Sequence, residues 1–192
     1  QSGLYHGYEA YFRWQFGTED IFLATKYGLS IRFKESDVRI TGRVSYGVIG
    51  MKLDPGDQVI GMQMASQGDY MLVASDKGKR TRISEFKSQL RNGRGLLCYN
   101  VTEKTGCLVG MKLVDDERDI MLITNEGILI RMSVDDISVI GRNTSGVKLM
   151  SIDPDSNVRV ATIAKVRESS HGDGEEDGED IKTDLENGDQ NE

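Results

Sequence analysis

The chain has 192 residues and a formal net charge of −7, but the charge is unevenly distributed along the sequence. Residues 168–192 hold eleven acids and one base, which leaves +3 on residues 1–167. A basic body beside an acidic tail favours a polyanionic partner, and the tail either competes for the same surface or only adds solubility. No apolar run is long enough for a membrane span, and Cys98 and Cys107 lack the spacing of a metal site.

Residues 1–19 hold a cluster of aromatic side chains and fit no repeat. We expect an irregular segment that covers an open edge or is not native sequence. Three units then follow, at 20–67, 68–116 and 117–166. Each contains an arginine that lies five residues before an acid and fifteen before a glycine. These sets are Arg32, Asp37 and Gly47; Arg80, Glu85 and Gly95; and Arg131, Asp136 and Gly146.

Each unit alternates apolar and polar residues in short runs separated by turn residues, which is typical of strands. The expected strands are 21–25, 29–34, 48–53 and 59–64, then 70–75, 79–83, 96–101 and 107–114, then 120–124, 128–132, 147–152 and 158–166. Four strands per unit at a period of about 50 residues predict an all-β, propeller-like repeat array of three blades. Residues 167–192 lack apolar periodicity and are predicted to be a disordered acidic tail.

The segment 77–95 sets seven bases against one acid, and Arg43 and Arg142 lie in the corresponding loops of the other units. Glycine lets a backbone approach a phosphate, and arginine or lysine binds its oxygens, although these glycines could serve only as turns. No recognition helix is apparent, so binding should not depend on base sequence. The predicted DNA-binding residues are Arg43, Lys77, Lys79, Arg80, Arg82, Lys87, Arg91, Asn92, Gly93, Arg94, Gly95 and Arg142.

Nothing in the sequence supports catalysis within this chain. Asp115–Asp116 and Asp135–Asp136 are adjacent acids of the kind that is usually solvated, and no phosphate-binding GxxxxGK[ST] motif occurs. We therefore expect no catalytic residue and no metal ligand here.

Three stretches, DIFLATKYGLSIRFKESDVRITGR, GKRTRISEFKSQLRNGRG and DIMLITNEGILIRMSVDDISVIGRNTSGVKLM, resemble the C-terminal domain of the DNA gyrase A subunit over residues 18–166. The resemblance implies a β-pinwheel whose basic rim wraps DNA within an ATP-dependent type IIA topoisomerase, an isomerase that introduces negative supercoils. It implies that the partners are duplex DNA, the gyrase B subunit and the rest of the gyrase A subunit. It implies no association with a membrane. ATP and Mg would be bound elsewhere in the parent enzyme, with no cofactor in this chain, and the location would be cytoplasmic, at the bacterial chromosome.

That family carries a box of sequence Gln-Arg-Arg-Gly-Gly-Lys-Gly in its first blade. Residues 89–95 are the nearest match and depart from it at Leu90 and Asn92, which indicates a later blade. Since the family ring usually has six blades, three blades predict an open arc of marginal stability. The equivalent domain of topoisomerase IV is an alternative. A propeller-like protein-interaction scaffold is another, for which apolar residues would be expected in place of Arg43, Arg91 and Arg142.

Overall fold

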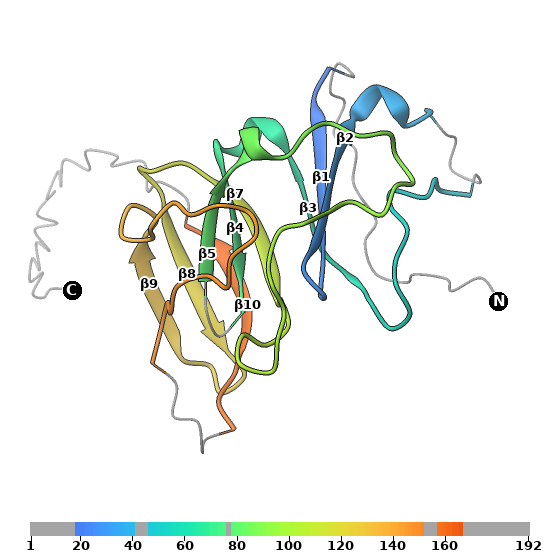
Figure 1. Cartoon of the computed structure of the whole chain (residues 1–192). Coiled ribbons are helices and arrows are strands. Elements are labelled where there is room, and N and C mark those ends of the chain that lie inside the picture. The colour runs from blue at the N-terminus through green and yellow to red at the C-terminus, as the bar shows by residue number, and fades with distance from the viewer. Residues whose placement is uncertain (1–17, 41–45, 76–77, 152–156, 167–192) are drawn as a thin grey trace, which may run out of the picture.

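A computed structural model describes residues 18–40, 46–75, 78–151 and 157–166, with only the backbone at 78–83 (Figure 1). This part of the chain is built from β-strands and three 3-10 turns, η1 (Glu35–Asp37), η2 (Ala65–Gln67) and η3 (Ile83–Glu85), and contains no α-helix. None of its helical segments is long and apolar enough to cross a membrane. The predicted all-β fold class is confirmed. The predictions for the aromatic segment 1–17 and the tail 167–192 lie outside the described residues.

The strands form three antiparallel sheets, one for each sequence unit. The first has the order β3-β1-β2-β6, with β1 (Asp20–Thr25), β2 (Leu29–Lys34), β3 (Val59–Met64) and β6 (Leu96–Leu97). The second has the order β5-β4-β7, with β4 (Tyr70–Ala74), β5 (Gly78–Arg82) and β7 (Gly110–Val114). The third has the order β10-β8-β9, with β8 (Asp119–Thr124), β9 (Leu129–Ser133) and β10 (Val160–Lys165). The first strand of each unit is therefore an inner strand of its sheet.

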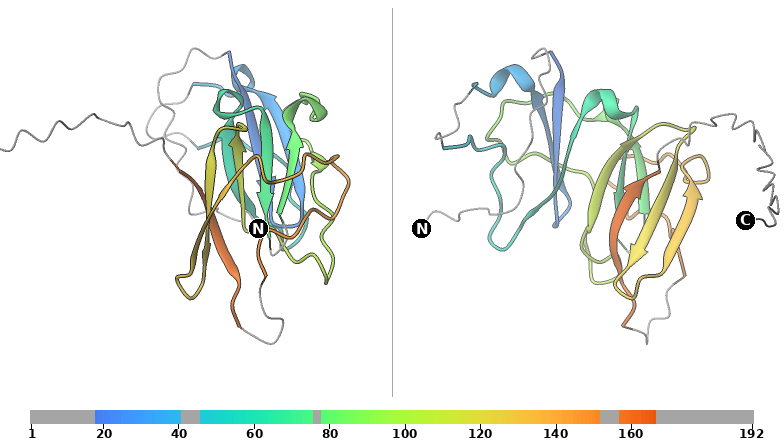
Figure 2. Two further views of the ribbon diagram at one scale, coloured as in Figure 1. Left: turned by 90° about the vertical axis from the view of Figure 1, so that its left-hand side faces the viewer. Right: turned by 180° about the vertical axis from the view of Figure 1, so that it is seen from behind.

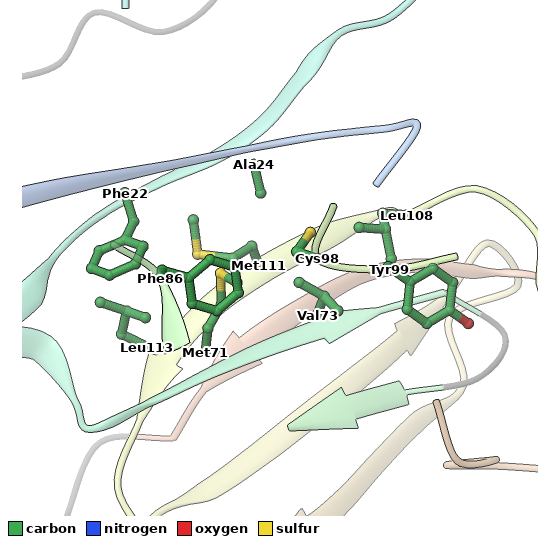
Figure 3. Close-up of a cluster of buried hydrophobic side chains, with 10 residues drawn as sticks. All are labelled: Phe22, Ala24, Met71, Val73, Phe86, Cys98, Tyr99, Leu108, Met111 and Leu113. Atoms are coloured by element: carbon green, nitrogen blue, oxygen red, sulfur yellow. The ribbon is translucent and has the colours of Figure 1, made fainter. Parts of the chain in front are cut away.

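The sheets stack because their inner strands are apolar on both faces. Along β4, Met71 and Val73 alternate with Leu72 and Ala74, and successive side chains of a strand point to opposite faces. Met71 and Val73 belong to a core shared with the first sheet, whereas Leu72 and Ala74 belong to a core shared with the third. Figure 3 shows the first of these cores, in which Phe22 and Ala24 of β1 face side chains of the second unit.

Several expected boundaries hold. The hairpin turns close with hydrogen bonds from Gly28 N–H to the Thr25 carbonyl and from Gly127 N–H to the Thr124 carbonyl. The turn that begins at Asp54 closes through Asp57 N–H to the Asp54 carbonyl at 3.0 Å. The last strand of the second unit is shorter than expected and begins at Gly110.

The prediction of a strand over 48–53 is wrong, because that segment forms only an isolated bridge between Met51 and Gly93. Of 96–101, only Leu96–Leu97 is a strand, and the described part of 147–152 contains none. These segments were expected to pair within their own unit. Instead β6, from the second unit, pairs with β2 of the first. Among the described strands, a four-stranded sheet is therefore found only in the first unit, and its fourth strand comes from the following unit.

One lysine links all three units. The Lys165 amine on β10 donates to the carbonyl of Gln67 at 2.6 Å and to that of Leu113 at 3.3 Å. Burial lowers the pKa of this amine below its ordinary value of 10.5; nearby Asp115 opposes the shift and Arg118 adds to it.

Candidate nucleic-acid interface

Three basic residues of the second unit, Lys87, Arg91 and Arg94, lie in a loop that passes over the first unit, here termed the crossing loop (residues 86–95). It begins at Phe86, whose ring is 1% exposed and packs edge-on against Phe22 with 6.1 Å between ring centroids (Figure 3). Such aromatic pairs add to the free energy gained by burial alone. Phe86 therefore fixes the start of the loop at the junction between the two units.

Backbone hydrogen bonds then hold the crossing loop along the first unit. Gln89 N–H donates to the Arg32 carbonyl at 2.7 Å, and Asn92 N–H donates to the Gly50 carbonyl at 2.8 Å. Lys52 N–H donates in turn to the Gly93 carbonyl at 2.8 Å. Because these main-chain hydrogen bonds fix the backbone of the crossing loop, its side chains start from defined positions on the first unit.

Gly95 has a conformational reason and a packing reason to be glycine. Its φ is +85°, a region that residues with a side chain rarely adopt, and a Cβ there would lie 2.6 Å from the Ser30 carbonyl oxygen. Asn92, with φ +68°, uses the tolerance of asparagine for the same region. The predicted role of Gly95 as a phosphate contact stays a prediction, and its contact with β2 was not foreseen.

Arg91 was predicted to face DNA, and its guanidinium is turned toward the first unit. Its Nε donates to the Asp37 carbonyl at 3.2 Å and its Nη1 to the Ile49 carbonyl at 2.6 Å. The side chain therefore fastens the crossing loop to the segment on either side of residues 41–45. A phosphate contact by the same guanidinium stays a prediction.

Arg94 lies in different surroundings. Its side chain is 69% exposed and pairs with Asp54 at 2.8 Å. An exposed pair of this kind contributes little stability, so a phosphate can replace the carboxylate at small cost. Lys87 and Asn92 are also exposed.

The structure adds Lys52, which sequence reasoning missed. It is exposed and its backbone is bonded to Gly93 of the crossing loop. It belongs to the first unit, in a segment expected to be a strand, so no local pattern could have placed it beside Arg94. Only knowledge that the units interlock would have revealed it.

The remaining predicted residues fall into three groups. Arg142 is half-buried in the corresponding loop of the third unit, where the Thr144 carbonyl accepts a hydrogen bond from Asn100 N–H at 3.4 Å. The backbone of Lys79, Arg80 and Arg82 lies on edge strand β5, and their side chains are not described. Arg43 and Lys77 lie outside the described residues. The structure thus gathers Lys87, Arg91, Asn92, Gly93, Arg94 and Gly95 in one loop.

Other chemistry finds no support in the part of the chain that is described. No three His, Cys, Asp or Glu side chains there gather into a group that could hold a metal ion. Asp135 and Asp136 are exposed, in keeping with solvated acids. The arrangement is a stack of sheets with interlocking loops, one of which carries exposed bases, and this defines a propeller-like repeat protein with a candidate polyanion-binding edge.

The chain belongs to the family of DNA gyrase C-terminal domains, a β-propeller family whose model matches residues 19–66, 69–115 and 118–167. It is 40% identical over 154 residues to the DNA gyrase A subunit of Ureaplasma parvum, a match that covers 79% of this chain and 18% of the relative. It is 38% identical over 176 residues to the DNA gyrase A subunit of Staphylococcus aureus, covering 90% and 20%. The chain thus spans about a fifth of the length of these relatives.

Two solved structures have a similar fold. A DNA gyrase A C-terminal domain superposes with a TM-score of 0.72 at 27% identity, covering 79% of this chain and 52% of that one. The C-terminal domain of a DNA topoisomerase IV superposes with a TM-score of 0.72 at 28% identity, covering 78% and 47%. The similarity of fold therefore does not separate gyrase from topoisomerase IV, whereas the named relatives are gyrase A subunits.

Proposed function

We propose that this chain binds duplex DNA without regard to base sequence and wraps it, as part of a gyrase A subunit in a type IIA topoisomerase. The observation that carries the proposal is the crossing loop, where exposed Lys87 and Arg94, with Lys52 beside them, sit on a backbone bonded to the neighbouring unit. A row of such loops along a repeat array would follow the phosphates of a bent duplex. Lysine and arginine side chains that replace counterions give affinity without base readout.

Within the parent enzyme, wrapping would set the handedness of the DNA crossover that is passed through the gate. Negative supercoiling would then use ATP hydrolysed by the gyrase B subunit, with ATP and Mg bound outside this chain. The duplex acted on would be the bacterial chromosome. The family membership and the gyrase A relatives support this proposal.

The DNA-binding part is tested by gel-shift titration of the 192-residue chain with duplex DNA at several salt concentrations. We expect a steep loss of affinity with salt and equal affinity for unrelated sequences. Lys87→Ala with Arg94→Ala should reduce the salt slope by about 0.9 for each phosphate that is no longer neutralised. Lys104→Ala, an exposed base in the Thr102–Gly106 turn, is the matched control. Unchanged binding by the double variant, or a strong preference for one sequence, would contradict the proposal.

The equivalent role in topoisomerase IV is a second candidate, because that domain matches the fold equally well. The two differ in outcome when the full-length parent protein is combined with relaxed plasmid and the ATP-hydrolysing partner. Net negative supercoiling with ATP identifies gyrase, whereas relaxation and decatenation without net supercoiling identify topoisomerase IV.

A further inference from the structure

An ion pair joins the crossing loop to the first unit. Nη2 of Arg94 lies 2.8 Å from Oδ2 of Asp54, and the two side chains are 69% and 40% exposed. The crossing loop and residues 46–58 lie around the first sheet, at the end of the stack away from the third sheet (Figures 1 and 2). A guanidinium binds a carboxylate or a phosphate through the same fork of N–H donors. The Asp54 carboxylate therefore occupies a group that also suits a DNA phosphate.

The Asp54 carboxylate is presented by a turn with a fixed backbone. Asp57 N–H donates to the Asp54 carbonyl at 3.0 Å, which closes the turn. The buried Asp57 side chain accepts hydrogen bonds from Tyr27 N–H at 2.9 Å and from Gln58 N–H at 2.8 Å. These bonds attach the turn to the hairpin between β1 and β2. Asp54 thus meets Arg94 from a defined position, and the pair needs no movement of either backbone.

Both junctions between units have a main-chain hydrogen bond at the same place. In the first junction, Lys52 N–H donates to the Gly93 carbonyl at 2.8 Å. In the second, Asn100 N–H donates to the Thr144 carbonyl at 3.4 Å. Gly93 and Thr144 each lie two residues before the repeat glycine of their unit. This bond therefore aligns the two junctions residue by residue.

The second junction has this backbone contact without the ion pair. In the alignment, Thr102 takes the place of Asp54, and Ser145 takes the place of Arg94. Thr102 also begins a turn, since its carbonyl accepts from Thr105 N–H at 3.1 Å. Acid and base are present together in one junction and absent together in the other, and the backbone contact forms in both. The ion pair is therefore not what holds two units together.

We propose that Asp54 is a positioning residue for DNA binding, which holds the Arg94 guanidinium until a backbone phosphate displaces the carboxylate. This inference rests on the proposed function. An exposed ion pair is weak enough to be exchanged for another anion. Breaking the pair offsets part of the free energy gained from the phosphate. Asp54 thus lowers the affinity for DNA at the first junction and favours release of the duplex.

The test is a gel-shift titration of the full chain with one duplex at low salt. Asp54→Asn removes the carboxylate, and asparagine suits the first position of a turn as well as aspartate does. Glu103→Gln, at an exposed acid in the corresponding turn of the second unit, is the matched control for the loss of one negative charge. We expect Asp54→Asn to bind about two- to fivefold more tightly than this control. Asp54→Glu, which keeps the carboxylate, should bind like the parent.

The Arg94→Ala background shows whether Asp54 acts through Arg94. There the extra affinity of Asp54→Asn over Glu103→Gln should disappear, because no guanidinium remains to be released. Asp54→Thr, which copies Thr102, provides a second neutral variant. Circular dichroism and urea denaturation check that the variants keep the fold and stability of the parent.

The outcomes separate this inference from the proposed function. If both neutral variants bind no more tightly than Glu103→Gln, or if the extra affinity persists with Arg94→Ala, the inference is overturned and the proposed function stands. A parent chain that binds no duplex would overturn the proposed function, and this inference with it.

Discussion

Arg91 and Arg94 carry the same charge in the same loop but have different neighbours. Arg91 donates to two carbonyls of the first unit, whereas Arg94 is exposed beside Asp54. We expect Arg91→Ala to lower the free energy of unfolding by about 1–2 kcal/mol, because two carbonyls lose a charged donor. Arg94→Ala should change the free energy of unfolding by less than about 0.5 kcal/mol and should reduce the salt slope of DNA binding. Urea denaturation and gel shifts separate the two effects, and equal destabilisation by both variants would refute this assignment.

Gly95 gives a second prediction at this scale, with Gly127 as its control. Both have positive φ, but a Cβ at Gly127 meets nothing within 4 Å, whereas one at Gly95 meets the Ser30 carbonyl. Gly127→Ala should therefore cost about 1–2 kcal/mol from backbone strain alone. Gly95→Ala should cost more by about 1–3 kcal/mol, because β2 and the loop must also separate. Equal losses in thermal unfolding of the two variants would show that the loop does not press on β2.

The sequence predicted a strand correctly where the strand it pairs with is close to it in the sequence. The hairpins β1–β2 and β8–β9 follow from alternation and a turn glycine, and both are present. The segments at 48–53 and 96–101 carry the same strand pattern, but their pairing depends on a strand edge in another unit. Lys52 was missed for the same reason, and no periodicity encodes contacts between units. The basic composition of the segment drew attention to the crossing loop, but it did not predict that the Arg91 guanidinium is turned toward the first unit.

Lys165 on β10 replaces the apolar residue that the first unit has in the corresponding place, since Lys165 pairs with Ile120 as Met64 pairs with Ile21. Its pKa is lowered by burial, so between that pKa and 10.5 the unfolded chain binds more protons than the folded one. The free energy of unfolding should therefore rise with pH across this window. Lys165→Met should abolish this rise and, at neutral pH, cost about 1 kcal/mol from the carbonyls left unpaired.

The control for that comparison is Lys148→Met, in which a lysine elsewhere in the third unit is exchanged in the same way. Urea titrations of both variants and the parent, at neutral pH and near 10.5, provide the measurement. If the parent gains no stability on approaching pH 10.5, the amine is not desolvated as described.

For the whole molecule, charge separation has a consequence that does not depend on the fold. We expect residues 168–192, with a net charge of −10, to compete with DNA phosphates at high effective concentration, and low salt to lengthen the reach of this charge. Deleting residues 168–192 should therefore tighten DNA binding, more so at low salt, with the melting temperature nearly unchanged. Filter binding at two salt concentrations would check this, and equal affinity of the truncated and full chains at both would contradict it. Marginal stability of the open stack likewise stays a prediction.

The pairing of β6 with β2 also sets an order of events during synthesis. The edge of β2 at Ser30 stays open until Leu96 and Leu97 are made, and the ribosome adds these about 67 residues later. At the usual rate of chain growth this is a delay of roughly 3–13 s, during which the first sheet lacks its fourth strand. A nascent chain that has exposed only the first unit should be cleaved readily by protease, and one that has exposed residues through 100 should resist. The point at which the first sheet gains its fourth strand thus lies well inside the second unit.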